Sequence, residues 1–557
     1  MSQTYRLLGE GLPGSSGAGG GSSFAADVRK TRAWVAALPR ANALATQQSL
    51  AQALDSLMGQ KLDGSTRLSV LEELRPTICE SIGLLKREYK GSSLPLQSLQ
   101  AAAARQVEAF HLGLAHGYRK AAVEYCAPSG SIPMLRGGNV ATALARAQWH
   151  YCQALSSAWR IYRAPAPGVW LGLHRVRNFA HEHKLDTRAA DDAIAGAPVD
   201  INALYLQALL VAVTHPLAFS QAEQDILWRI SSDFATRSSV DRSPPNSNAP
   251  VVPEDGDWGP GPGIAGEMHS QWLDMQLFCR EVDDALERQR DGSSDLMPSR
   301  GPGIRVSVEM LDRLKRSFGL AAARTHKRLD ADHWLRTVVG LSGLHFHLAG
   351  QRDFDAFVRQ ASLHIVHVAH RASWARASTD ATRVPVHDAR VLDQSLGGYR
   401  MSWGQADQVR ARVGELVGLS LEDSDEFPEW MLGVIRWLRY EEGGALSAGV
   451  ELVSRRTGAV GLRVHGVDGF AREPVRALEM EDLDATDEIQ FLAPNTLDAG
   501  ATRIEVIRDA GAATGAPGIE EMLAGVEILL NAGDYALLRP LRPDLVSDAE
   551  AEAVGPQ

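Results

Sequence analysis

The sequence predicts an α+β protein with several domains: a large all-α helical region, then an antiparallel β-barrel, then a second small β unit. The chain has 557 residues, more than one compact domain ordinarily holds. Before residue 237, apolar residues recur at steps of three and four, the period of a helix with one buried face. From about residue 334, short runs typical of β-strands, joined by short connections, replace that period.

Residues 27–237 make up the predicted helical domain. In the stretch 95–126, Leu96, Leu99 and Ala103 begin an apolar face, and Pro95 suits the first turn of a helix. No fixed residue period repeats, so we expect a helical bundle or an irregular helical array. Further helices are predicted near 44–59, 138–163, 168–188, 199–214 and 219–237.

The segments that flank the helical domain have a different composition. Residues 1–26 are rich in Gly and Ser and are predicted to form a flexible tail. Residues 238–303 are predicted to be a Pro/Gly-rich loop followed by a connecting helix near 267–290. The prolines among the glycines of 259–263 exclude a dinucleotide-binding loop there.

The third domain is predicted over residues 304–465. It begins with a helix near 305–323, and a strand follows in which Leu344, Phe346 and Leu348 alternate. Residues 349–390 are an insertion, helical in part around 352–371. The remaining strands of the predicted barrel are 398–404, 409–419, 430–440, 445–453 and 459–464.

The end of the chain carries five further strand signals. They lie at 475–481, 487–493, 501–508, 523–529 and 533–539, and we assign 466–545 to a C-terminal β unit that packs on the barrel. Residues 546–557 are acidic and Ala-rich and are predicted to be a tail.

Composition and charge restrict the classes of function. Hydrophobic residues make up 45% and charged residues 22%, as in ordinary globular proteins. A net charge of −11 argues against non-specific nucleic-acid binding but allows one local basic pocket for a small dianion. The four cysteines lack metal-site spacing, which indicates buried, reduced thiols. With no secretory signal and no apolar run of about 20 residues, we expect a cytoplasmic protein without membrane insertion.

Two short motifs carry the strongest functional signal. The first is Arg324-x-x-x-Arg328, and the second is Asp393-x-Ser395-x-x-Gly398, which precedes a strand. Each is common alone, because a basic helix end or an Asx turn supplies it. Together, in this order and beside barrel strands, they resemble the paired signature of the PilZ-domain family.

The resemblance implies both a fold and a ligand. PilZ domains are small barrels whose characteristic ligand is the bacterial second messenger cyclic di-GMP. Carried over position by position, the resemblance assigns cyclic di-GMP binding to Arg324, Arg328, Asp393, Ser395 and Gly398. It covers about residues 324–464, and the helix-rich remainder is similar to larger multidomain PilZ receptors.

The residue types suit such a ligand. Arginine presents a planar fork that can bond bidentately to a phosphate or to the O6 and N7 edge of guanine, and its face can stack on a base. Asp393 can accept from guanine N–H groups or orient an arginine, and Ser395 can donate to a phosphate or cap the turn. Gly398 lets backbone approach the ligand.

Other candidate sites are weaker. His364, His367 and His370 can share a helix face, but no carboxylate nearby completes a metal site, so a polar helix face is the preferred interpretation. His345 and His347 alternate on the predicted strand and line either a pocket or the solvent face. No metal and no cofactor are predicted.

No motif for catalysis is present. The sequence has no Gly-x-Ser-x-Gly, no Walker-type loop and no His-Glu-x-x-His, and it lacks the motifs of diguanylate cyclases and their phosphodiesterases. We therefore expect a receptor and not an enzyme: cyclic di-GMP rearranges the helical region relative to the barrel, and an unidentified protein partner reads the change. The alternative is a PilZ-like adaptor that binds no nucleotide and acts through protein–protein contacts. The family suggests roles in motility, biofilm formation and virulence.

Overall fold

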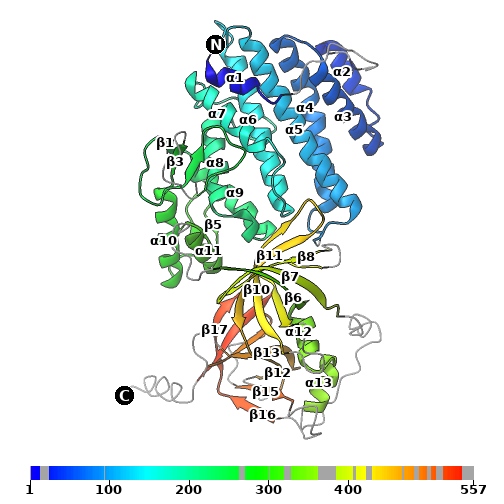
Figure 1. Ribbon diagram of the computed structural model, residues 1–557, viewed down its shortest axis with the longest axis vertical. Coiled ribbons are helices and arrows are strands. Elements are labelled where there is room, and N and C mark those ends of the chain that lie inside the picture. The colour runs from blue at the N-terminus through cyan, green and yellow to red at the C-terminus, as the bar shows by residue number, and fades with distance from the viewer. Residues whose placement is uncertain are drawn as a thin grey trace. The chain divides into compact units, whose positions relative to one another are not determined.

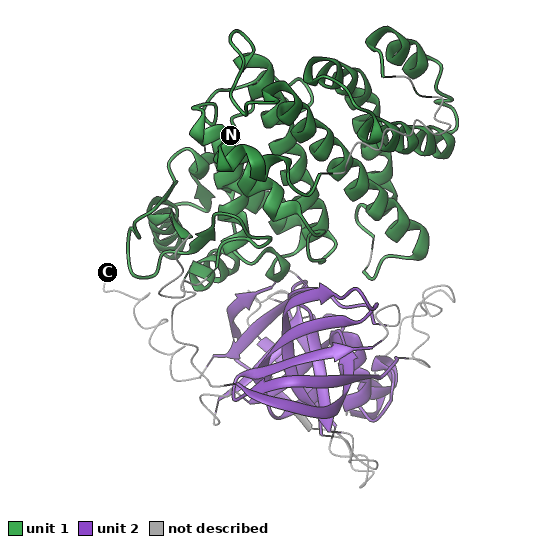
Figure 2. Cartoon of the chain, turned by 45° about the horizontal axis from the view of Figure 1, so that its top comes forward, with its two compact units in different colours: residues 1–323 green, residues 324–557 purple. Residues whose placement is uncertain are grey.

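The computed structural model forms two compact units, residues 1–323 and 324–557 (Figures 1 and 2). The predicted α+β fold class is confirmed, with helices first and β-structure second. The structure describes residues 2–12, 24, 26–92, 94–261, 270–299, 301–318, 328–361, 384–404, 409–421, 429–466, 470–481, 488–497, 503–509, 519–532 and 534–541.

The first unit is built mainly from helices whose starts are fixed by side-chain caps. Asp63 accepts hydrogen bonds from the backbone of Ser65 and Thr66, and Ser220 and Glu223 form a capping box. The long α5 packs against both α4 and α6 (Figure 1). The helices are α1 (Gln3–Gly9), α2 (Val28–Ala36), α3 (Ala43–Gly59), α4 (Gly64–Tyr89), α5 (Ser98–Cys126), α6 (Gly137–Arg160), α7 (Val169–Glu182), α8 (Ile201–Val213), α9 (Gln221–Ala235), α10 (Gln276–Arg290) and α11 (Val308–Phe318).

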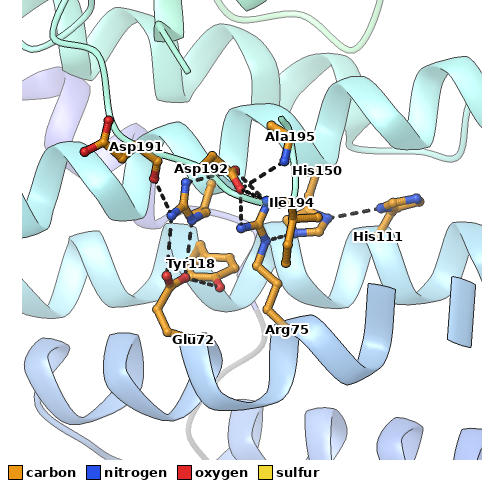
Figure 3. A network of polar contacts seen from close by, with 10 residues as sticks. Glu72, Arg75, His111, Tyr118, His150, Asp191, Asp192, Ile194 and Ala195 are labelled. Carbon is orange, nitrogen blue, oxygen red and sulfur yellow. Dashed lines mark hydrogen bonds and ion pairs between the residues drawn. The ribbon is translucent and has the colours of Figure 1, made fainter. Parts of the chain in front are cut away.

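A buried network of polar side chains crosses the helical core (Figure 3). Arg75 binds Asp192 through two hydrogen bonds of 2.9 and 2.7 Å, and Arg146 Nη1 lies 2.8 Å from the same carboxylate. Arg75 Nε also donates to His150 Nε2 over 3.0 Å. His150 Nδ1 lies 3.1 Å from His111 Nδ1. Two cations thus share one buried carboxylate, and a pair of imidazoles adjoins them.

The protonation of the two imidazoles follows from this arrangement. Because Arg75 can only donate, His150 Nε2 accepts, and a neutral His150 carries its proton on Nδ1. That proton points at His111 Nδ1, so a neutral His111 carries its own on Nε2, an atom without a hydrogen-bond partner among the described residues. Burial lowers the pKa of both rings well below the ordinary value, which keeps them neutral.

Three predictions for this unit were wrong. Residues 3–9, expected in a tail, form α1, because Tyr5 and Leu8 are buried in the core. The expected loop contains a three-stranded sheet in the order β1-β3-β2, and residues 270–274, expected in the helix near 267–290, form β3. The helix α11, expected in the barrel domain, buries Met310 in the first unit's core. The strands are β1 (Ser239–Asp241), β2 (Val251–Pro253), β3 (Ser270–Asp274), β4 (Leu296–Met297) and β5 (Ile304–Arg305).

The second unit contains a closed antiparallel barrel in the order β10-β11-β8-β7-β6-β9. Alternate residues fill its interior: Val391, Met401 and Trp403 are buried, and Trp403 Nε1 donates to Thr337 Oγ1 over 2.9 Å. The strands are β6 (Leu329–Val339), β7 (His387–Ser395), β8 (Gly398–Trp403), β9 (Leu416–Leu421), β10 (Met431–Tyr440) and β11 (Leu446–Ser454).

A seven-stranded antiparallel sheet packs on this barrel. Leu478 and Leu492 of the sheet share one apolar core with Val338 and Leu432 of the barrel. The strand at 457–465, expected in the barrel, belongs to this sheet, because it pairs on both sides with sheet strands. Its order is β16-β15-β12-β13-β14-β18-β17, with β12 (Thr457–His465), β13 (Val475–Glu481), β14 (Ile489–Pro494), β15 (Arg503–Arg508), β16 (Ile519–Leu523), β17 (Val526–Asn531) and β18 (Tyr535–Pro540).

The residues expected to form a strand at 344–348 lie instead in a helix, α12 (Leu341–Leu348). Gly340, at φ 90°, turns the chain after β6, and the helix buries Leu344 and His345. His345 Nε2 lies 3.2 Å from the carbonyl oxygen of Val460, so this histidine is a packed core residue and not a ligand. The short α13 (Phe354–Ala361) follows.

Several predictions fall outside the described residues: the histidines at 364, 367 and 370, and the tail 546–557. In the part of the chain that is described, no three His, Cys, Asp or Glu side chains cluster as a metal site would need. Nor does any described helix have the length and hydropathy to span a bilayer. Cys126 and Cys152 are buried as expected, whereas Cys79 and Cys279 are half-buried.

Candidate functional site

Arg328 of the first motif and the residues of the second motif meet at one end of the barrel wall formed by β6, β7 and β8. Arg328 directly precedes β6, while Asp393 and Ser395 end β7 and Gly398 begins β8. Antiparallel pairing places Leu329 opposite Gln394, which brings Arg328 beside the second motif. Arg324 lies outside the described residues.

An ion pair joins the motifs. Arg328 Nη1 donates to Asp393 Oδ1 over 2.5 Å, and Arg400 Nη1 lies 3.7 Å from Asp393 Oδ2. The Asp393 side chain is 15% exposed, against 42% for Arg328 and 38% for Arg400. One mostly buried carboxylate therefore lies between two more accessible guanidinium groups.

A β-bulge in β7 orients the side chain of Asp393. Between Val391 and Asp393 the register shifts, so that two residues of β7 oppose one residue of β8. Such bulges re-aim side chains and are common beside functional sites. Here the shift sets Asp393 directly opposite Arg400.

The hairpin that follows depends on Gly398. Its φ is +149°, and a Cβ at this position would overlap the carbonyl oxygen of Val450 on β11. Ser395 Oγ donates to the Gly398 carbonyl over 3.4 Å, and the Leu452 N–H donates to the Gly397 carbonyl over 2.9 Å. These contacts fix the turn against β11. Gly398 is thus required by the close approach of the β11 backbone, whereas its predicted contact with the ligand stays a prediction.

One row of directly paired residues runs across five strands of the barrel. In order from β10 to β6 it contains Trp437, Gly449, Arg400, Asp393 and Asp330. Residues directly opposite in a sheet point to the same face. The Trp437 indole lies over Gly449, where a Cβ would overlap it, so the ring lies beside Arg400 on the outer face. A half-buried indole and two guanidinium groups therefore share one surface.

Arg400 and Trp437 belong to neither motif, and no signal in the sequence marks them as site residues. Arg400 lies only two residues after Gly398, but its place beside Asp393 depends on the bulge. Its Nε is buried without a hydrogen-bond partner among the described residues. By contrast, Arg436 pairs with Glu451, and Arg390 donates to Asp332 over 2.6 Å. The buried Nε of Arg400 therefore lacks the carboxylate partner that the Nε of Arg436 and the Nε of Arg390 each have within the barrel.

Family models match most of both halves of the chain. Residues 29–245 match the family model "Cyclic-di-GMP receptor FimW, N-terminal domain", and residues 265–380 and 366–458 match "Cyclic-di-GMP receptor FimW, middle PilZ domain". The chain belongs to the PilZ-domain family. The middle match spans both motifs, and its two segments overlap at residues 366–380, which lie between the motifs and follow α13.

A curated relative supports the same assignment. The chain is similar to the cyclic-di-GMP receptor FimW of Pseudomonas aeruginosa, with 24% identity over 483 residues. The alignment covers 77% of this chain and 78% of the relative, so it includes parts of both units.

Proposed function

We propose that this protein is a cytoplasmic receptor for cyclic di-GMP, which binds on the outer face of the PilZ barrel at Arg328, Asp393, Ser395 and Gly398. The observation that carries the proposal is the placement of Arg328 and Arg400 on either side of Asp393. The FimW matches over both units support the same ligand.

Binding is an exchange of partners for the arginines. A phosphate or the O6 and N7 edge of guanine replaces Asp393 at Arg328, and Asp393 is released to accept from guanine N–H groups or to hold Arg400. The Trp437 ring offers a surface on which a base can stack. Arg324, four residues before Arg328, supplies a further guanidinium.

The output is a change in the arrangement of the two units, which an unidentified protein partner reads. Arg328 directly follows the segment that links α11 to β6. A ligand that engages Arg328 therefore acts on the connection between the units, and it shifts their arrangement only if it binds one arrangement more tightly. The protein acts as a receptor without turning the nucleotide over.

One observation favours a second candidate, a PilZ-like adaptor that binds no nucleotide. Arg328 is already paired with Asp393, so the nucleotide must compete with an ion pair made within the protein. In that case the barrel serves as a scaffold, and its contacts with other proteins carry the function.

Calorimetric titration of the full chain with cyclic di-GMP separates the two candidates. The receptor predicts saturable micromolar binding that Arg328→Ala weakens by about ten- to a hundredfold, the loss of one charge-assisted contact. Arg32→Ala is the matched control, because Arg32 is an exposed, ion-paired arginine of α2. No binding heat from the wild type would favour the adaptor.

A further inference from the structure

The first unit contains a cleft that the proposed function does not use. It lies between α1, α7 and the β1-β3-β2 sheet and has a volume of about 1250 Å³. Polar residues of α7 form one wall, and the sheet and the segment after β2 form another. Clefts of this size accommodate small organic ligands.

Arg177 is the unusual member of this cleft. It is only 5% exposed, yet among the described residues no carboxylate oxygen lies within ion-pair distance of it. Its Nη1 donates to the neutral amides of Asn178 and Gln271, each over 3.3 Å, and its guanidinium lies 5.6 Å from the Tyr205 ring. A buried cation without a counter-ion is costly, and an anion beside it offsets that cost.

The other arginines of the cleft differ in this respect. Arg175 Nε donates to Asp255 over 2.7 Å and its Nη2 lies 3.4 Å from Glu10, while the exposed Arg242 lies 4.0 Å from Glu254. Glu182, which also lines the cleft, accepts from Thr4. These carboxylates would repel a ligand with many negative charges, so the cleft suits a ligand with one anionic group.

Two tryptophans line the same cleft. Trp258 is 60% exposed and Trp272 is half-buried. An accessible indole stacks well on a flat ring. The cleft thus combines an anion-binding group with aromatic surfaces.

We propose that this cleft binds a small organic anion that carries a planar ring. Its phosphate or carboxylate binds Arg177, and its ring packs against Trp258 and Trp272. A nucleoside monophosphate and an aromatic carboxylate share this chemistry. The site lies within the first unit and is independent of the barrel motifs.

The test uses the full chain carrying Arg328→Ala, in which binding at the barrel is weakened, and the substitutions described below assign the bound probe to the cleft. Calorimetry and tryptophan fluorescence follow titration with guanosine monophosphate, adenosine monophosphate, indole-3-acetate and benzoate, up to about 5 mM. The proposal predicts saturable binding of at least one probe, and the class that binds identifies the anionic group. Failure of all four probes overturns it and leaves the cyclic di-GMP titration unaffected.

Substitutions then locate the binding. Arg177→Gln and Trp258→Ala should each weaken the bound probe by about tenfold or more, and Arg32→Gln should not. Since Arg177 is buried, its variant is first checked by circular dichroism. If Arg177→Gln does not fold, the affinity of Trp258→Ala, which changes an exposed residue, decides whether the probe binds in the cleft. Unchanged affinity in Trp258→Ala, or in a folded Arg177→Gln, contradicts the proposal.

Discussion

Arg328 and Asp393 are 65 residues apart in the chain, yet Arg328 Nη1 lies 2.5 Å from Asp393 Oδ1. The pairing of β6 with β7 creates this contact, because it sets Asp330 opposite Asp393. The intervening α12 and α13 pack against strands of the second sheet and leave the contact intact. The long insertion is therefore compatible with a motif pair that acts as one site.

Trp437→Ala should weaken cyclic di-GMP binding. A base stacked on an aromatic side chain contributes about 1–3 kcal/mol, so we expect a loss of about five- to a hundredfold or more. The measurement is calorimetric affinity, with Trp258→Ala in the first unit as control. Equal affinity of Trp437→Ala and wild type would exclude the ring from the site.

Gly398→Ala should destabilise the second unit by about 2 kcal/mol or more, because its Cβ would overlap backbone that cannot yield without opening the β8–β11 pairing. Gly404→Ala is the control, since a Cβ there meets no atom within 4 Å. Thermal unfolding of both variants checks this. A similar Tm for the two would show that the close approach at Gly398 is not needed.

Asp192→Ala should cost the first unit about 3–5 kcal/mol, because it leaves Arg75 and Arg146 buried without their shared counter-ion (Figure 3). Glu80→Ala removes an exposed carboxylate that lies 3.3 Å from Arg40 and should cost under about 1 kcal/mol. Denaturant unfolding monitored by helical circular dichroism compares them. A small loss in Asp192→Ala would mean that the network is not a stabilising feature.

The first unit should lose stability as pH falls below about 6.5. Burial lowers the pKa of His111 and His150 well below the ordinary value and that of His174 to about 4. As the pH falls from about 6.5 toward these lower pKa values, the histidines of the unfolded chain take up protons while those of the folded chain stay neutral. The free energy of unfolding therefore decreases with falling pH. Each such proton contributes up to about 1.4 kcal/mol per pH unit.

Helical circular dichroism during thermal unfolding at pH 7.5 and 5.5 measures this effect. We expect a lower Tm at pH 5.5. An unchanged or higher Tm would show that the imidazoles are already charged, or accessible to water, in the folded protein.

The sequence predicted that helices precede the β-structure, and it contained the second motif in recognisable form, because both signals lie within short stretches of the chain. The strands β8, β10 and β11 begin and end within about one residue of the predicted bounds. The alternation of Leu344, Phe346 and Leu348 led to the wrong prediction of a strand, because an apolar pattern over only five residues fits one face of a helix as well as a strand. Tyr5 and Leu8 are too few to give a period, so α1 was missed.

The composition of the binding surface was less accessible to sequence reasoning. Arg400 and Trp437 come together through two strand pairings and a bulge. Neither a strand pairing nor a bulge produces a residue spacing that can be recognised in the sequence. Arg177 is similar: its lack of a carboxylate partner depends on which side chains surround it after folding. A register is a property of the sheet and not of any one strand.

The most direct test is a crystal structure of the full chain with cyclic di-GMP. We predict that the nucleotide lies on the outer face of the barrel, with Arg328 and Arg400 bonded to phosphate or guanine and the backbone of Gly398 in contact. A nucleotide bound elsewhere, with the Arg328–Asp393 ion pair unchanged, would contradict the account.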